Sequence, residues 1–277
     1  NSDIREEFTN WFTKVDVIFH LAALPRIKPS FKNPTEVLEV NVNGTASVLE
    51  YTRNNEIPVI YAGSSSKHHG LYGSPYAWSK FAGEQLCELF STTFGVNTTI
   101  CRFYNVYGPH QLEEGDYSTV IGIFERQYRN NEPLTITSDG EQRRDFTYVG
   151  DIVDGLVKCG RSLLIRNEFN ARVDGETFEL GRGKNYSINE ISNLFGGNKV
   201  YLPQRKGEYD MTLADSSKAK ELLDWNPTHN IKDYHTWELE ATLSFVSKTR
   251  LTSLFRTRPK KQSKNGLENT EREMQKA

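Results

Sequence analysis

A tyrosine and a lysine stand four residues apart in the segment SPYAWSK, residues 74–80. On a helix, residues at this spacing lie one above the other, so the phenol of Tyr76 and the ammonium group of Lys80 can act at one site. A free phenol has a pKa of about 10, and lowering it to about 7 requires about 4 kcal/mol. One cation about 5 Å away, in an effective dielectric of about 20, supplies about 3 kcal/mol. Tyr76 can therefore serve as a base near neutral pH only if a second positive charge joins Lys80.

The same spacing is common on exposed helices that do no chemistry, so the rest of the chain decides between the two interpretations. Its 277 residues are 36% hydrophobic and 25% charged, with a net charge of −2. This composition indicates a globular protein with no nucleic-acid partner. No apolar stretch is long enough to span a membrane, and the polar first residues exclude a signal peptide. The three widely spaced cysteines form no metal or disulfide pattern, which favours the reducing cytoplasm.

Apolar segments of strand length alternate with helical segments in the first part of the chain. We expect strands at residues 15–21, 57–62 and 97–103, and helices at residues 33–54 and 76–94. Nearly continuous apolar strands are typical of a parallel sheet that helices cover on both faces. Ligands of such folds bind beyond the carboxyl ends of the strands. Those ends carry the small or polar groups Ala22-Ala23, Ser64-Ser65 and Asn105.

The alternation loosens after Tyr107. Helices are expected near residues 118–129, 151–164, 187–195 and 216–223, a short strand at 134–137 and a loop at 139–144. Residues beyond about 245 are polar and partly basic, which predicts a solvated tail. A basic arm that binds nucleic acid is the alternative interpretation of that tail.

Motifs along residues 16–234 resemble, in their order, the extended short-chain dehydrogenase/reductase family. Within it, the chain is similar to the NAD-dependent sugar-nucleotide epimerases and dehydratases. Each motif is common by itself, and the order of the whole set makes the resemblance specific. The motifs are FHLAA (19–23), NVNGT (41–45), SSS (64–66), PYxxSK (75–80), RFYNVYGP (102–109), RRDF (143–146), YVxDI (148–152), RKGE (205–208), ADxxK (214–218) and WNP (225–227).

The resemblance implies an α/β fold with a doubly wound parallel sheet of truncated Rossmann type and a smaller substrate-binding lobe. Residues 1–110 would form part of a dinucleotide-binding domain, to which residues 146–182 return. Residues 111–145 and 183–245 would form the lobe, and residues 246–277 a disordered tail.

The resemblance also implies roles for the residues that could do chemistry. Tyr76 would exchange a proton with the 4-hydroxyl of a sugar, and Ser65 would hydrogen-bond the same hydroxyl. Lys80 would hold the nicotinamide ribose and lower the pKa of the tyrosine. Oxidised NAD would supply the second positive charge. The implied contacts of NAD are Ala22, Ala23, Asn41, Ser64, Tyr76, Lys80 and Tyr104.

For a nucleotide-sugar substrate, the resemblance implies contacts to the pyrophosphate from Asn105, Arg144 and Arg205. A planar guanidinium group suits paired phosphate oxygens. Glu208 would also contact the substrate, at a position where the family usually has aspartate, and Ser65 would contact the sugar. Arg144 could instead form a surface ion pair with Asp145. No metal site is expected.

Two departures from the family pattern affect these expectations. The glycine-rich loop that cradles a dinucleotide pyrophosphate is absent, and the FHLAA motif comes early in the chain. We therefore expect a fragment that lacks the first strands of the domain. Eleven positions separate Ser65 from Tyr76, about half the usual loop. A shorter loop predicts a more open site or an unusual substrate, and it allows Ser66 to take the role given to Ser65.

Among the reactions of the family, the residues favour epimerisation at C4 of a UDP-hexose. Dehydratases and decarboxylases carry acidic residues just after the serine or threonine, whereas residues 66–69 read SKHH. Those two reactions stay open as alternatives, as does a non-catalytic sugar-nucleotide-binding protein, which the missing glycine loop motivates. The helix after Tyr76 carries more large apolar side chains than one buried stripe needs, namely Trp78, Phe81, Leu86, Leu89 and Phe90. This excess predicts a homodimer.

Overall fold

A four-stranded parallel sheet organises the computed structural model, which describes residues 3–5, 15–164 and 173–234. Its strand order is β1-β2-β3-β8, and all three pairings are parallel. The strands are β1 (Ile18–His20), β2 (Val59–Ser64), β3 (Thr98–Phe103) and β8 (Thr177–Leu180). Every residue of β2 is buried, as a strand covered on both faces requires.

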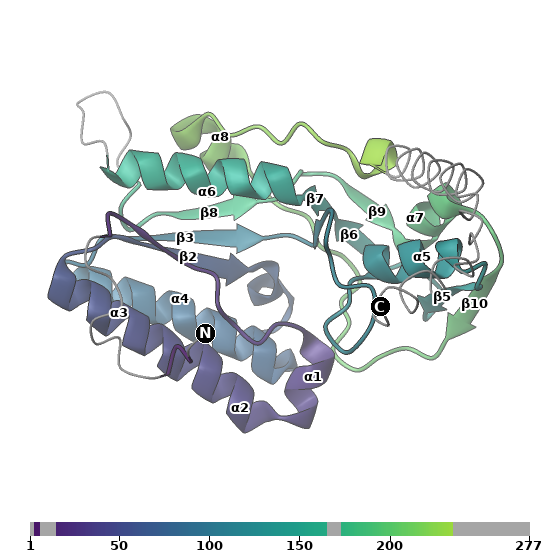
Figure 1. The fold of residues 1–277 in the computed structure, drawn as a ribbon, viewed down its shortest axis with the longest axis horizontal. Helices are drawn as coiled ribbons and strands as arrows, with labels where there is room; N and C mark the ends of the chain where they lie inside the picture. The colour runs from purple at the N-terminus through teal and green to yellow at the C-terminus, as the bar shows by residue number, and fades with distance from the viewer. Residues whose placement is uncertain (1–2, 6–14, 165–172, 235–277) are drawn as a thin grey trace, which may run out of the picture. The chain divides into compact units, whose positions relative to one another are not determined.

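Helices lie on both faces of this sheet, which confirms the doubly wound architecture. In Figure 1, α6 and α8 run along one side of the strands, and α3 and α4 run along the other. The helices of the described residues are α1 (Ile27–Lys32), α2 (Pro34–Leu38), α3 (Gly44–Asn55), α4 (Pro75–Phe94), α5 (Val120–Arg129), α6 (Val149–Leu164), α7 (Ile188–Phe195) and α8 (Ser217–Leu223).

Successive side chains of β2 point to opposite faces and enter two different cores. Ile60 packs with Leu156 and Trp225 in the cluster beneath α6 and α8. Its neighbours Val59 and Tyr61 pack with Leu49 and Cys87 in the cluster beneath α3 and α4. The alternating side chains of β2 thus anchor one layer of helices on each face of the sheet.

The helix that carries Tyr76 and Lys80 has clear signals at both ends. Ser74 caps its first turn by accepting a hydrogen bond from the backbone amide of Ala77 at 3.1 Å, and Pro75 occupies the first helical position. Gly95 ends the helix in the left-handed conformation with φ of 70°. α4 therefore begins at Pro75 and holds the two residues in register.

The helix expected at residues 33–54 is interrupted. A π-type segment, η1 (Glu39–Asn43), separates α2 from α3. Such segments add one residue to a helical turn and are frequent at functional sites. Here the segment contains Asn41, whose buried side chain is held on both sides of its amide by the loop after β1. The periodicity of the sequence did not reveal this insertion because apolar residues continue through it.

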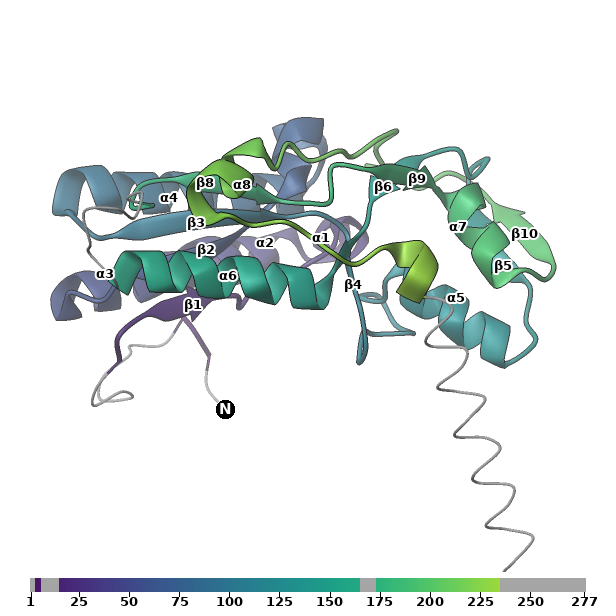
Figure 2. The ribbon, with the colours of Figure 1, turned by 90° about the horizontal axis from the view of Figure 1, so that it is seen from above.

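A second group of elements packs around a core of its own, which includes Phe124, Ile136 and Ile191. Figure 2 shows α5, α7 and their strands beyond one end of the parallel sheet. Residues 139–144 were expected as a loop, but Arg143–Asp145 forms β6 because it pairs with an antiparallel partner, β9. The strands of this group and of the connection to it are β4 (Val106–Tyr107), β5 (Leu134–Thr137), β6 (Arg143–Asp145), β7 (Thr147–Tyr148), β9 (Asn185–Ser187) and β10 (Lys199–Leu202). The tail expected at residues 246–277 lies outside the described residues.

Candidate functional site

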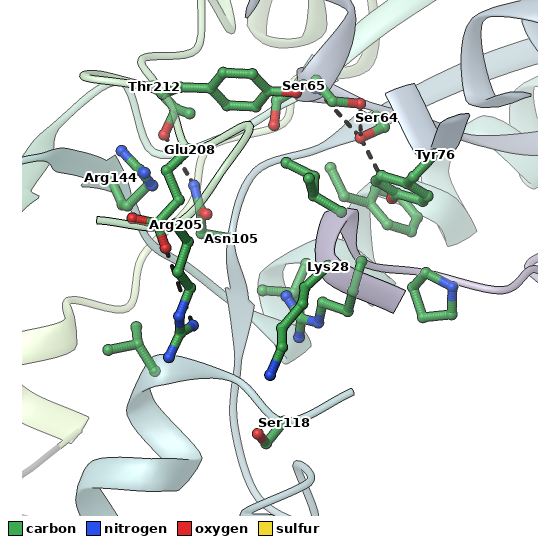
Figure 3. A pocket seen from close by; sticks show the side chains of 18 of the residues that line it. Lys28, Ser64, Ser65, Tyr76, Asn105, Ser118, Arg144, Arg205, Glu208 and Thr212 are labelled. Carbon is green, nitrogen blue, oxygen red and sulfur yellow. Dashed lines mark hydrogen bonds and ion pairs between the residues drawn. The ribbon is translucent and has the colours of Figure 1, made fainter. Parts of the chain in front are cut away.

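A cavity of about 660 Å³ lies at the carboxyl ends of β1, β2 and β3. Its wall is formed by the segments that follow these strands, by the first turns of α4 and by residues 205–209. Both its volume and its place beyond the strand ends are those of a ligand site in a parallel α/β fold. In Figure 3, Ser64 and Tyr76 lie at one side of the cavity, and Arg144, Arg205 and Glu208 lie together at the other.

Tyr76 donates a hydrogen bond from its hydroxyl to Ser64 Oγ at 3.4 Å. Burial raises the pKa of the Tyr76 phenol above its usual value of 10. The hydrogen bond to Ser64 and the positive charge of Arg26 lower this pKa in part. The lowered pKa expected from the sequence is thus not a property of these residues alone, because desolvation outweighs them.

The three serines at residues 64–66 differ in their contacts with Tyr76, and the contact of Ser65 with the sugar stays a prediction. Ser64, not Ser65, bonds the hydroxyl of Tyr76, and Ser66 Oγ lies 2.9 Å from Ser64 Oγ. Ser64 also caps the short helical segment η2 (Ser65–His69), which fixes the direction of its side chain. Ser65 lines the same cavity without a bond to the tyrosine among the described contacts. The chain turns into η2 at this point, and this turn aims the first serine of the three at the phenol.

Lys80 lines the same cavity as Tyr76, as their spacing on one helix predicts. Its side chain is almost fully buried, and its Nζ lies 4.2 Å from the centre of the Tyr61 ring. Burial lowers the pKa of Lys80 from 10.5 to about 8, while the nearby Cys87 and Glu84 raise it. A lysine so desolvated at a cavity is typical of a functional group rather than of an exposed helix pair.

The residues expected to contact NAD fall into two groups. Ala23, Ser64, Tyr76 and Lys80 line the cavity, where a small side chain beside three polar groups suits a nicotinamide and its ribose. Asn41 lies outside the lining: it donates to Ser79 Oγ at 3.0 Å and bonds both polar groups of the Leu24 backbone. It therefore positions the loop that follows Ala22 and Ala23.

Tyr104 and Ala22 also lie outside the cavity lining. The hydroxyl of Tyr104 donates to Glu179 Oε2 at 2.8 Å, and the side chain is fully buried. The sequence pattern did not show this because Glu179 belongs to β8, far along the chain. The structure places Tyr104 in the packing between β3 and β8, and its contact with the cofactor stays a prediction.

The residues expected to contact the substrate meet at the other side of the cavity. Asn105 donates to the Asp145 carbonyl and to Thr212 Oγ1, and its backbone adopts a positive φ of 31°. Arg144 and Arg205 face Glu208, and an ion pair of 4.0 Å joins Arg205 to this carboxylate. Burial raises the pKa of Glu208 and lowers that of Arg144.

The surface ion pair between Arg144 and Asp145 is not formed. Asp145 is fully buried and instead accepts hydrogen bonds from the backbone amides of Arg182, Gly183 and Ala214. These bonds satisfy the carboxylate locally. The guanidinium group of Arg144 is therefore not paired with Asp145, and Arg144 lines the cavity.

Two residues of this site had not been singled out from the sequence. Arg26 lies in the segment after β1 and lines the cavity, and its charge acts on Tyr76. Tyr209 lines the cavity between Tyr76 and Arg144, and the pKa of its phenol is raised by burial. The position of Arg26 was a usable signal, because it belongs to the short segment between β1 and α1, and β1 has its carboxyl end at the site.

The histidines take no part in a metal centre within the described part of the chain. His20 is buried and hydrogen-bonds Thr45 Oγ1 at 2.9 Å through Nε2. His68 pairs with Glu179 at 2.6 Å. Among residues 3–5, 15–164 and 173–234, no cluster of three or more potential metal ligands is present. None of the helices described is long and apolar enough to cross a membrane.

Comparison with known proteins assigns the chain to a family. The sequence model of the NAD dependent epimerase/dehydratase family matches residues 1–171. The chain belongs to this family, as the motifs predicted, and NAD is the cofactor on which the family depends.

Individual relatives agree with this assignment. The chain is 34% identical over 245 residues to an uncharacterized UDP-glucose epimerase of Bacillus subtilis strain 168, covering 81% of this chain and 73% of the relative. It is 31% identical over 239 residues to the UDP-glucuronate 4-epimerase of Thermodesulfobacterium geofontis, covering 79% and 70%. Among solved structures, UDP-glucuronic acid 4-epimerase from Bacillus cereus, in complex with UDP-glucuronic acid and NAD, matches with a TM-score of 0.74 and 28% identity, over 85% of this chain and 76% of the other.

Proposed function

We propose that the chain catalyses epimerisation at C4 of a UDP-linked hexose through a transient 4-keto sugar, with NAD as cofactor. The main support is the meeting of Tyr76, Ser64 and Lys80 with Arg144 and Arg205 in one cavity. An acid–base group and a pair of arginines at opposite sides suit a substrate with a hydroxyl at one end and a pyrophosphate at the other.

In this proposal the arginine side of the cavity holds the nucleotide, and the sugar extends to Tyr76. Tyr76 takes the proton from the 4-hydroxyl and returns it after the sugar has turned over. Ser64 accepts a hydrogen bond from the phenol and keeps it aimed at the sugar. Bound NAD would supply the hydride acceptor and donor for C4. Its positive charge would add to that of Arg26, which opposes the effect of burial on the pKa of the phenol.

Epimerisation is favoured over dehydration or decarboxylation by the residues next to the serines. Lys67 and His68 belong to η2, where Lys67 Nζ lies 3.6 Å from Glu84 Oε2 and His68 Nε2 lies 2.6 Å from Glu179 Oε1. Elimination of water needs a carboxylate close to C5 and C6 of the sugar, and this segment supplies none. The carboxylate of Glu208 lies beside Arg144 and Arg205, on the side of the cavity that we assign to the nucleotide.

The test is to incubate the full-length protein and NAD with UDP-glucose and to identify the product. We expect UDP-galactose, and we expect Tyr76→Phe to reduce its formation by about 10²- to 10⁴-fold. Tyr72→Phe is the matched control, because Tyr72 is 89% exposed and outside the cavity lining. A 6-deoxy-4-keto product would indicate a dehydratase. In a parallel incubation with UDP-glucuronate, a UDP-pentose and CO2 would indicate a decarboxylase. Binding without turnover in the complete protein would support the non-catalytic alternative.

We also propose that the protein forms a homodimer through α4. Leu86 and Phe90 of this helix pack against the core, whereas Trp78, Leu89 and Phe94 stay exposed by 39%, 49% and 45%. Exposed apolar side chains gathered on one helix are typical of a protein interface. Light scattering after size-exclusion chromatography tests this proposal: Leu89→Lys should convert a dimer to a monomer, and a monomeric wild-type protein would contradict it.

A further inference from the structure

Arg26 is a cation of the cavity to which no contact with the substrate has been assigned above. It follows β1 in the segment before α1 and lines the cavity together with Tyr76 and Ser64. Its positive charge lowers the pKa of the Tyr76 phenol, so the guanidinium group lies within electrostatic reach of the group that acts on the sugar. Burial lowers the pKa of Arg26, which shows that its charge is partly desolvated.

The guanidinium group has no carboxylate partner among the described residues. Its Nε donates to the carbonyl oxygen of Tyr117 at 3.2 Å, and this bond fixes the plane of the group. Arg144 and Arg205, by contrast, both face Glu208. Desolvated charges in proteins are normally paired, since an unpaired one is costly. The terminal amino groups of Arg26 are thus the suitable donors for an anion that enters the cavity.

The backbone at Arg26 supports a functional role. Its φ of 82° with ψ of 139° falls in a region that side chains other than glycine rarely adopt. Such a conformation is strained and is concentrated at active sites and ligand contacts. The following residues begin α1, so the strained residue turns the chain between β1 and that helix while its side chain lines the cavity.

We propose that Arg26 binds the C6 carboxylate of a nucleotide-linked hexuronic acid, which makes this class of sugar the preferred substrate. In a hexose the C6 group is carried by C5, next to C4. A sugar whose 4-hydroxyl meets Tyr76 therefore has C6 within a few ångströms of that hydroxyl, and Arg26 lines the same cavity within electrostatic reach of the Tyr76 phenol. A carboxylate there would form the charge-assisted pair that the guanidinium group lacks. This inference rests on the proposed function and narrows its substrate.

A pyrophosphate is the other anion that the substrate offers, and the two sources make different predictions. If Arg26 contacts the pyrophosphate, replacing Arg26 should weaken the binding of every UDP-sugar and of UDP by the same factor. If Arg26 contacts the C6 carboxylate, replacing Arg26 should weaken the binding of a UDP-linked uronic acid alone. Lys28 is a suitable control for simple loss of charge, because it lines the same cavity but is exposed and lies 3.7 Å from Asp116.

The test compares UDP-glucuronate, UDP-glucose and UDP with the full chain in the presence of NAD, by titration calorimetry and by turnover. We expect the wild-type protein to prefer UDP-glucuronate by about 10-fold or more. Arg26→Gln should weaken its binding and kcat/KM by about 10- to 100-fold relative to UDP-glucose, the usual effect of losing a charge-assisted bond. Arg26→Lys should recover part of the preference, and Lys28→Gln should leave the ratio unchanged.

The outcomes separate this inference from the proposed function. If Arg26→Gln weakens the binding of UDP-glucuronate, UDP-glucose and UDP by the same factor, Arg26 contacts the pyrophosphate and the inference is overturned. Conversion of UDP-glucose as efficient as that of UDP-glucuronate in the wild type would also overturn it, with the epimerase proposal intact. If neither sugar is turned over, the epimerase proposal fails, and the ratio of the two binding constants still decides whether Arg26 recognises a carboxylate.

Discussion

The hydroxyl of Tyr76, in the first turn of α4, lies 3.4 Å from the Oγ of Ser64, the last residue of β2. The bond joins a helix and the strand that precedes it, and both ends are held independently. Ser74 caps the helix, and Ser64 caps η2 by accepting from the amide of Ser66 at 3.3 Å. A phenol placed in this way keeps one orientation without a substrate, which reduces the ordering that binding must accomplish.

The first prediction concerns which serine supports the tyrosine. Since Ser64 accepts the bond from the phenol, Ser64→Ala should reduce kcat by about 10- to 100-fold, because the loss of one aligned hydrogen bond to a reacting group has about this size. Ser65→Ala should have a smaller effect on kcat, since Ser65 lines the cavity without that bond. Steady-state kinetics of both variants over a range of UDP-sugar concentrations make the comparison.

The opposite order would show that the tyrosine changes its partner when the substrate binds. In that case Ser65 would have the role that the family resemblance gave it, and the bond to Ser64 would describe the protein without its substrate. Circular dichroism of both variants serves as the folding control.

The second prediction concerns Lys80 and pH. The folded-state pKa of Lys80 is about 8, whereas the unfolded value is near 10.5, because burial disfavours the charged form. Between these values the unfolded chain binds more protons than the folded one, so stability contributed by this group rises with pH from about 8 to 10.5. Below pH 8 the folded state bears the full cost, about 3 kcal/mol at about 1.4 kcal/mol per pH unit.

Replacing Lys80 removes the free-energy cost of burying its charged ammonium group, and it also removes the catalytic role proposed for Lys80. Lys80→Met should raise the free energy of unfolding at pH 7 by about 1–3 kcal/mol, since the lost contact with the Tyr61 ring offsets part of the gain. Its advantage over the wild type should shrink as pH rises from 8 to 10. Urea unfolding at pH 8 and pH 10 measures the difference in free energy of unfolding between Lys80→Met and the wild type. Lys220→Met, on the exposed side of α8, is the control. A destabilised Lys80→Met at pH 7 would contradict the prediction.

The sequence predicted most of what depends on local pattern. The apolar runs that became β2 and β3 and the helical segments that became α4 and α7 are short-range signals. The placement of Tyr76 and Lys80 in one cavity followed from helix geometry alone.

What the sequence did not predict depends on partners that are distant along the chain. Tyr104 was expected at the cofactor, but its hydroxyl meets Glu179, 75 residues later. The bond of Tyr76 to Ser64 was also not expected, and it reflects the direction in which β2 turns into η2. Arg26 drew no attention because a single arginine forms no pattern, and its importance comes from a cavity assembled by several segments.

The third prediction concerns a buried ion pair behind the site. Glu84, two turns after Tyr76 on α4, accepts three hydrogen bonds of 2.9 to 3.2 Å from the guanidinium group of Arg102 on β3. The side chain of Glu84 is 2% exposed, and Lys67 of η2 lies 3.6 Å from it. The pair thus connects α4, β3 and the segment that follows the serines.

Removing one partner should leave an uncompensated buried charge. Arg102→Met is expected to lower the free energy of unfolding by about 3–5 kcal/mol, because Lys67 alone compensates Glu84 only in part. The double variant Glu84→Met/Arg102→Met should be more stable than Arg102→Met, since no unpaired carboxylate remains beneath the site. Equilibrium urea unfolding of the two single variants and the double variant forms a complete cycle.

An exposed ion pair, Glu50 with Arg53, is the control for the loss of stability expected from the buried pair. Glu50 and Arg53 on α3 approach to 3.2 Å with about half of each side chain exposed, so Glu50→Ala should cost less than about 1 kcal/mol. A loss of similar size in Arg102→Met would mean that solvent reaches Glu84 and that the pair does not fix η2. A large loss in Arg102→Met that the second substitution partly restores would instead tie the position of the serines to this pair, because Lys67 bonds the same carboxylate.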